Sequence, residues 1–108
     1  MTKRIVFVLV AALGAALPAH ANKGNYEAGK AKSAACAACH GPDGVSQISA
    51  FPKLAGQHRD YLYQALKDYQ SGARKNPLMA EQVKGLSEAD LRDLATYFSQ
   101  QKGLTLKY

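Results

Sequence analysis

The sequence has little cysteine: its 108 residues contain only Cys36 and Cys39. Two cysteines with two residues between them close a very small disulfide ring, which stabilises a fold little, and such pairs are usually reactive. The sequence also lacks an apolar run of the roughly 20 residues that a membrane-spanning helix needs. The run from Ile5 to Leu17 is shorter than that. We therefore expect neither a disulfide framework nor a transmembrane segment in the mature chain.

The N-terminus has the pattern of a secretory signal peptide. Lys3 and Arg4 precede the apolar run, and Ala19 and Ala21 supply the small side chains of a cleavage site. We expect residues 1–21 to be removed and residues 22–108 to form one domain in the bacterial periplasm, with an uncleaved anchor as the alternative. A domain of this size buries a lower fraction of its surface than a large domain does, so we expect a bound metal or cofactor to stabilise it.

Dense runs of lysine and arginine are also missing, which excludes the usual pattern of nucleic-acid binding. Removing Lys3 and Arg4 from the 14 basic residues leaves 12 against 8 acidic residues, a mature net charge of about +4. This basic excess fits docking on an acidic protein partner, although it serves solubility equally well.

No segment has the alternating pattern of a strand, and there is no internal repeat. The sequence therefore predicts an all-α domain of three to four helices. Asn25 and Ser87 are expected N-caps, Ser87 within a capping box, and Gly72 is an expected helix stop. Glycine and proline predict irregular segments over residues 41–57 and 72–86. Helices are predicted over residues 26–38, 59–71 and 88–101, with one further helical turn around residues 80–84.

The segment Cys36-Ala37-Ala38-Cys39-His40 matches C-x-x-C-H, the attachment signature of c-type haem. On a helix, three residues make just under one turn, so both thiols face one side and can form thioethers to neighbouring vinyl groups. His40 follows where its imidazole can ligate the iron. A zinc site, with His58 as fourth ligand, and a thioredoxin-like dithiol are the alternatives. The latter normally follows a strand, and none is predicted.

An iron that only carries electrons needs a second axial ligand. After removal of Met1, Met79 is the only thioether, and it lies in the irregular segment before the last helix. A single methionine is ordinarily core filler, but here we expect Met79 to ligate the iron. His58 is the competitor and would give a bis-histidine haem of lower potential.

Several blocks in order make the chain resemble a class I cytochrome c of the small bacterial kind, cytochrome c4/c5-like or c553-like. The blocks that carry this resemblance are Gly29-Lys30-Ala31, Cys36-Ala37-Ala38-Cys39-His40-Gly41, Phe51-Pro52-Lys53-Leu54-Ala55-Gly56-Gln57, Asn76-Pro77-Leu78-Met79 and Leu86-Ser87. The resemblance implies one covalently attached haem c and the class I cytochrome c fold around it. Because there is one C-x-x-C-H, two-haem behaviour would require a partner.

The resemblance also implies roles for individual residues. The Pro52 carbonyl would accept a hydrogen bond from the His40 ring, Leu54 would pack on the haem, and Gly29 would let the first helix approach the ring of Tyr97. Residues implied near the haem propionates are Gln57, Tyr69 and Arg74.

We expect a one-electron carrier rather than an enzyme, with redox proteins as donor and acceptor. Lys53, Lys75 and Lys84 are predicted docking residues for acidic partner surfaces. One alternative is a subunit of a larger oxidoreductase complex. The other is a haem protein that binds a gas or activates peroxide, which requires Met79 to be off the iron.

Overall fold

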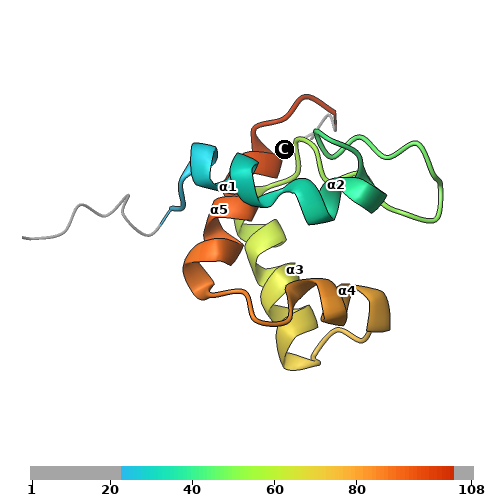
Figure 1. Cartoon of the computed structure of the whole chain (residues 1–108), viewed down its shortest axis with the longest axis vertical. Coiled ribbons are helices and arrows are strands. Elements are labelled where there is room, and N and C mark those ends of the chain that lie inside the picture. Colours follow the sequence, from blue (N-terminus) through green and yellow to red (C-terminus); the bar gives the residue numbers. More distant parts are fainter. Residues whose placement is uncertain (1–22, 104–108) are drawn as a thin grey trace, which may run out of the picture.

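The computed structural model describes residues 23–103, so the expected signal peptide and its cleavage point lie outside the described residues. Between residues 23 and 103 the chain forms five helices and no strand (Figure 1). The helices are α1 (Tyr26–Lys32), α2 (Ala34–His40), α3 (Arg59–Ser71), α4 (Pro77–Val83) and α5 (Glu88–Ser99). The all-helical prediction is confirmed, with five helices in place of three to four.

The segment predicted as one helix over residues 26–38 forms two helices, α1 and α2, because the helix is interrupted at Ser33. Its hydroxyl donates to the Lys30 carbonyl at 2.8 Å, and its backbone N–H donates to the same oxygen at 3.3 Å. Serine side chains compete in this way for backbone groups and so favour helix ends. The second helix then continues to His40, beyond the predicted end at Ala38.

The prediction for α4 was also too short. Asn76 caps this helix, and Pro77 occupies its first turn. Proline is tolerated there because the first N–H groups of a helix have no intrahelical partner. The prediction treated Pro77 only as a residue that breaks helices, so it placed the start of this helix at Ala80, three residues too late.

α5 forms the centre of the domain, and α1 and α3 both pack against it. Of the eight buried apolar side chains among the described residues, five belong to α5: Leu91, Leu94, Ala95, Tyr97 and Phe98. Its start has the predicted capping box, in which Ser87 accepts from the Asp90 amide and Asp90 accepts from the Ser87 amide. The core is therefore built mainly on one well-capped helix, in which residues 93–98 are all buried.

α1 crosses α5 at Gly29, where the two backbones almost touch. A β-carbon added to Gly29 would lie 2.0 Å from the Asp93 carbonyl oxygen and 2.8 Å from the Tyr97 β-carbon. The close approach is the one expected, but the backbone of α5 limits it more than the ring of Tyr97 does. On either side of the crossing, Asp93 accepts from the Asn25 amide at 2.7 Å and from Lys32 Nζ at 2.6 Å.

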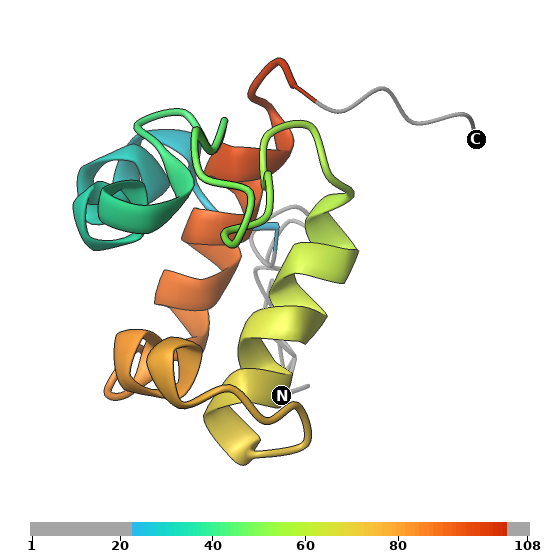
Figure 2. The same cartoon turned by 90° about the vertical axis from the view of Figure 1, so that its right-hand side faces the viewer.

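α1 and α2 lie at one end of the α3–α5 pair and α4 lies at the other, as both views show (Figures 1 and 2). The irregular segment over residues 41–57 returns from α2 to the start of α3. It is tied to α5 by the Gly56 amide, which donates to the Phe98 carbonyl at 3.0 Å, and by the Tyr97 hydroxyl, which donates to the Pro42 carbonyl at 3.0 Å. None of the helices between residues 23 and 103 has the length and apolar character to cross a bilayer.

Candidate haem-binding site

α2 is an apolar helix with little protein packed against it. Six of its seven residues are alanine or cysteine, yet only His40 is buried. Its main helix contact is with α1, its neighbour in the chain. Apolar surface left in water is costly at about 25 cal/mol per Å². A helix of this composition therefore fits a large apolar group that covers it.

Both cysteines of this helix are free thiols. Cys39 is exposed, whereas Cys36 is half-buried and packs against the core. Burial raises the pKa of the Cys36 thiol, because a thiolate would be poorly solvated there. Their positions, three residues apart on one helix, put both sulfurs on one side of α2, as two thioethers to a single porphyrin require.

His40 is held in one orientation by the following loop. Its Nδ1 lies 2.7 Å from the carbonyl oxygen of Pro52. A carbonyl accepts only, so Nδ1 carries the proton and Nε2 keeps a lone pair for a metal. The edge of the Phe51 ring also faces the imidazole, with centroids 6.5 Å apart. The hydrogen bond from His40 to Pro52 is the one that the resemblance implies. It orients the imidazole to act as a metal ligand.

Met79 lies on α4, at the opposite end of the molecule from α1 in Figures 1 and 2. It occupies the third position of the helix and is half-buried, whereas its neighbour Leu78 is 69% exposed. A thioether from α4 and an imidazole from α2 therefore come from two separate, short helices. The donor set of the described residues, two thiols, one oriented imidazole and one thioether, is the one that a class I haem c uses.

The core is open to further apolar packing on several sides. Half-buried apolar side chains border it, and these include Cys36, Leu54 and Leu66. Leu54 follows the Pro52 carbonyl that orients His40, so the same loop supplies an apolar side chain and the acceptor. Residues that are apolar, partly exposed and adjacent to the core fit a bound porphyrin better than they fit open solvent.

Of the three residues predicted near propionates, Tyr69 and Arg74 are in contact, whereas Gln57 lies apart from them. Arg74 lies over the Tyr69 ring, 4.8 Å from its centroid, and donates weakly to the Tyr61 hydroxyl at 3.5 Å. Gln57 lies before α3 and accepts from the His58 amide at 2.8 Å, while Arg74 lies beyond the other end of that helix. Contacts from all three to propionates stay a prediction.

The competing sites are not formed in the part of the chain that the structure describes. No three side chains of histidine, cysteine, aspartate or glutamate come together there as metal ligands, so Cys36, Cys39, His40 and His58 do not form a zinc site. His58 is exposed at the start of α3. Within residues 23–35 no strand precedes the Cys-x-x-Cys pair, whereas the pair of a thioredoxin-like protein follows a strand.

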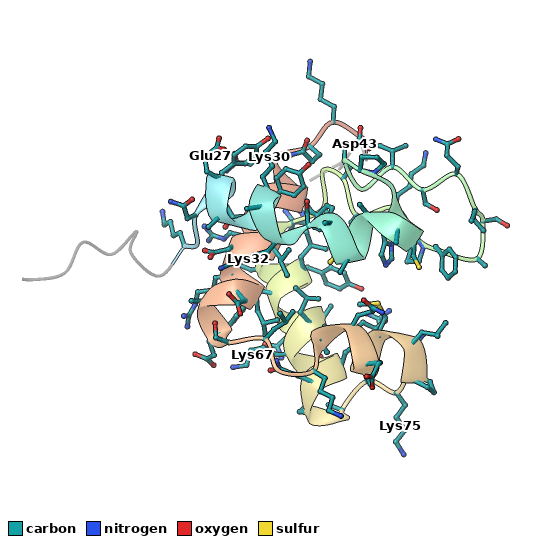
Figure 3. The ribbon with its side chains drawn as sticks, in the orientation of Figure 1. Glu27, Lys30, Lys32, Asp43, Lys67 and Lys75 are labelled. Atoms are coloured by element: carbon teal, nitrogen blue, oxygen red, sulfur yellow. The ribbon has the colours of Figure 1, made fainter. Side chains whose placement is uncertain are left out.

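Lys53, Lys75 and Lys84 are all exposed. In Figure 3, Lys75 extends outward beyond α4, at the opposite end of the molecule from Asp43 and Glu27 near α1. Of the three, only Lys84 borders the hollow between α3 and α4, which is lined by Tyr69, Gln70, Pro77, Ala80, Glu81, Lys84, Gly85 and Leu86. Sequence reasoning missed Asn76 and Gln70, which hold α4. An asparagine directly before a proline is a recognisable cap signal, whereas the Gln70 contact is visible only in three dimensions.

Comparison with known proteins agrees with this geometry. Residues 26–102 match the family described as "Cytochrome c". The chain is 43% identical over 109 residues to cytochrome c4 of Stutzerimonas stutzeri, covering 93% of this chain and 51% of the relative. It is 40% identical over 82 residues to cytochrome c-554(548) of Halomonas halodenitrificans, covering 73% of this chain and 99% of the relative. The crystal structure of reduced recombinant cytochrome c4 from Pseudomonas stutzeri superposes with a TM-score of 0.72 at 46% identity, covering 75% of this chain and 47% of that one. The chain thus spans about half the length of the cytochrome c4 relatives.

Proposed function

The chain belongs to the cytochrome c family, and on that premise we propose that it is a one-electron carrier with a single His/Met-ligated haem c. The family and the single C-x-x-C-H motif imply one covalently held haem c. Cys36 and Cys39 would attach the porphyrin, and His40 and Met79 would ligate the iron. The observation that carries the proposal is α2, which presents the attachment motif on an apolar helix that little protein covers.

When bound, the haem supplies an iron centre that gains and loses one electron. His40 and Met79 would both hold the iron, so that its surroundings would change little between the two oxidation states. The Pro52 carbonyl fixes the tautomer and direction of His40 and raises the basicity of Nε2. A thioether from Met79 favours the reduced iron and so raises the potential relative to two nitrogen ligands. Leu54 and Leu66 would exclude water beside the ring.

The ligand set is tested by the optical spectrum of the ferric protein and by carbon monoxide binding to the ferrous protein. We expect the weak long-wavelength band of an iron–thioether bond and slow carbon monoxide binding. Met79→Leu keeps the volume and apolar character of the side chain but removes the sulfur, so it should abolish the band and bind carbon monoxide at once. Leu78→Ala, on the same helix and exposed, is the matched control and should behave as wild type.

An open coordination position in the wild-type protein would contradict the carrier proposal. If the ferric spectrum lacks the band and carbon monoxide binds at once, the gas-binding or peroxidatic alternative takes its place. If the band is missing but carbon monoxide is still excluded, His58 is the sixth ligand, and His58→Ala should then open the iron.

We propose that the carrier docks on acidic surfaces of its redox partners through Lys53, Lys75 and Lys84. Small oxidants of opposite charge test the sign of the field around the site. Replacing the three lysines with glutamate should slow oxidation by anionic ferricyanide and speed oxidation by a cationic cobalt(III) complex, with both effects fading at high salt. Lys30→Glu, an exposed position of α1 at the opposite end of the molecule from Lys75 (Figure 3), is the control. Equal rates for the triple variant and this control would contradict the docking assignment.

We further propose that residues 1–21 are a cleaved signal peptide and that residues 22–108 work in the periplasm. Support comes from the charged, apolar and small-residue pattern of the N-terminus. N-terminal sequencing of protein isolated from the periplasm should begin at Asn22. Recovery of the intact N-terminus from the membrane fraction would instead indicate an uncleaved anchor. Co-purification in fixed ratio with a dehydrogenase or oxidase would favour a subunit of a complex over a free carrier.

A further inference from the structure

α4 carries the proposed ligand Met79 but has little intrinsic stability. It has seven residues, and only Val83 among them is buried. Isolated helices shorter than roughly 12–15 residues are marginal in water. Contacts from outside the helix must therefore hold it in place, and the structure contains such contacts at both ends.

At the N-terminal end, Asn76 forms a cap on Met79 itself. Its side-chain oxygen accepts a hydrogen bond from the Met79 backbone amide at 3.1 Å, and its carbonyl accepts from the Ala80 amide at 2.8 Å. The cap thus fixes the backbone of the residue whose sulfur is proposed to reach the iron. Pro77, in the first turn, restricts the backbone between them.

At the C-terminal end, α3 holds α4 through one side chain. Gln70 Nε2 donates to the Val83 carbonyl at 3.0 Å and to the Leu86 carbonyl at 2.7 Å. The Val83 carbonyl also accepts from the Leu86 amide at 3.2 Å, so the Gln70 amide adds a second bond to this helix end and links both α4 and the turn after it to α3. Gln70 and Asn76 therefore act at opposite ends of the same seven residues.

We propose that Asn76 and Gln70 are positioning residues that keep the Met79 sulfur on the iron. The inference rests on the proposed His/Met ligation and deepens it. Neither side chain touches the iron. Asn76 acts by fixing the Met79 backbone, and Gln70 acts by preventing α4 from separating from α3. Loss of either contact raises the fraction of molecules in which Met79 has left the iron, while His40 and both thioethers stay in place.

Carbon monoxide binding to the ferrous holoprotein measures that fraction, since the gas enters only when Met79 is off. We expect Asn76→Ala to raise the binding rate by about fivefold, the effect of losing a typical N-cap. Asn76→Asp keeps the acceptor oxygen and should stay within about twofold of wild type. Gln70→Ala should also raise the rate by about fivefold or more, since two hydrogen bonds are lost.

Gln64→Ala is the matched control on the same helix. Gln64 is exposed and donates only to the Asp68 carboxylate at 2.8 Å, and its loss should leave the carbon monoxide rate unchanged. The long-wavelength ferric band gives a second readout. It should disappear on heating at a lower temperature in Asn76→Ala and Gln70→Ala than in Gln64→Ala, before helical circular dichroism is lost.

The outcomes separate this inference from the function on which it rests. If wild type has the band and excludes carbon monoxide, but Asn76→Ala and Gln70→Ala bind the gas no faster than Gln64→Ala, the positioning role is wrong and the carrier stands. If Asn76→Asp behaves as Asn76→Ala, the cap does not act through its acceptor oxygen. If wild type itself binds carbon monoxide at once, Met79 ligation is wrong and the positioning role falls with it.

Discussion

Replacing Gly29 with alanine tests the crossing of α1 and α5, on which the domain is built. The added β-carbon would lie 2.0 Å from the Asp93 carbonyl oxygen and 2.6 Å from its carbonyl carbon. Both are backbone atoms in the middle of a buried helix, so they cannot rotate away as a side chain can. To reach an ordinary contact distance, α1 would have to retreat from α5 by about 1.4 Å.

The contacts beside Gly29 determine the size of the effect. A retreat of α1 strains the hydrogen bonds from Asn25 and Lys32 to Asp93. Overpacking of this kind costs about 1–3 kcal/mol, and each strained hydrogen bond adds about 1 kcal/mol. The higher helix propensity of alanine offsets about 1 kcal/mol. We expect Gly29→Ala to lower the free energy of unfolding by about 2 kcal/mol or more.

Urea unfolding of the haem-loaded protein, followed by circular dichroism, measures this loss. The urea midpoint should fall by about 1 M. Lys30→Ala, an exposed substitution in the same helix, should leave it nearly unchanged. A Gly29→Ala protein as stable as the Lys30→Ala control would refute the reasoning, because it would mean that the crossing of α1 and α5 has room for a β-carbon at residue 29.

Two further predictions follow from the thiols and the carboxylates. In the haem-free protein, iodoacetamide should alkylate exposed Cys39 before Cys36, because burial raises the pKa of the Cys36 thiol. Peptide mass mapping after brief labelling detects the order of alkylation. Equal alkylation rates at the two cysteines would contradict the prediction. The Lys32 ammonium and the Ser87 amide lower the pKa of Asp90 from 3.8 to about 2. The stabilising effect of the Asp90 carboxylate is therefore complete above pH 3.8 and lost as the pH falls through about 2. On acidification, Asp90→Asn should lose less stability than wild type, as measured by urea titrations. Parallel losses of stability in the two proteins would contradict this.

The starts and ends of helices were predicted correctly from the sequence where contacts within one helical turn decide them. The helix over residues 59–71 has the expected bounds, and Gly72 ends it in a left-handed conformation. Asn25 caps α1 through the Ala28 amide as expected, and Ser87 begins α5 with a complete capping box. Caps and stops involve residues within one turn of each other, so a linear pattern contains the necessary information.

The sequence predicted less where a single residue can act in two ways. Ser33 could continue a helix or bond to the preceding turn, and it does the latter. Pro77 could end a helix or begin one, and it begins α4. Propensity alone decides neither choice, and the hydrogen bonds that do, from Ser33 to the Lys30 carbonyl and from the Met79 amide to Asn76, became visible only in the structure.

Contacts between distant segments were the least predictable part of the site. The C-x-x-C-H motif identifies the haem-attachment residues from spacing alone, and the hydrogen bond between His40 and Pro52 was implied only by resemblance. The two bonds from Gln70 to the end of α4 join residues 13 and 16 positions apart. Glutamine on an exposed helix face gives no sequence pattern for such a role.

The most direct test of the account is the intact mass of the protein purified from a periplasm that has haem-attachment machinery, measured under denaturing conditions. We expect a single species with the mass of residues 22–108 plus one haem, because two thioether bonds at Cys36 and Cys39 would survive denaturation. A species with the mass of the polypeptide alone would contradict the central claim that this chain carries a covalent haem c.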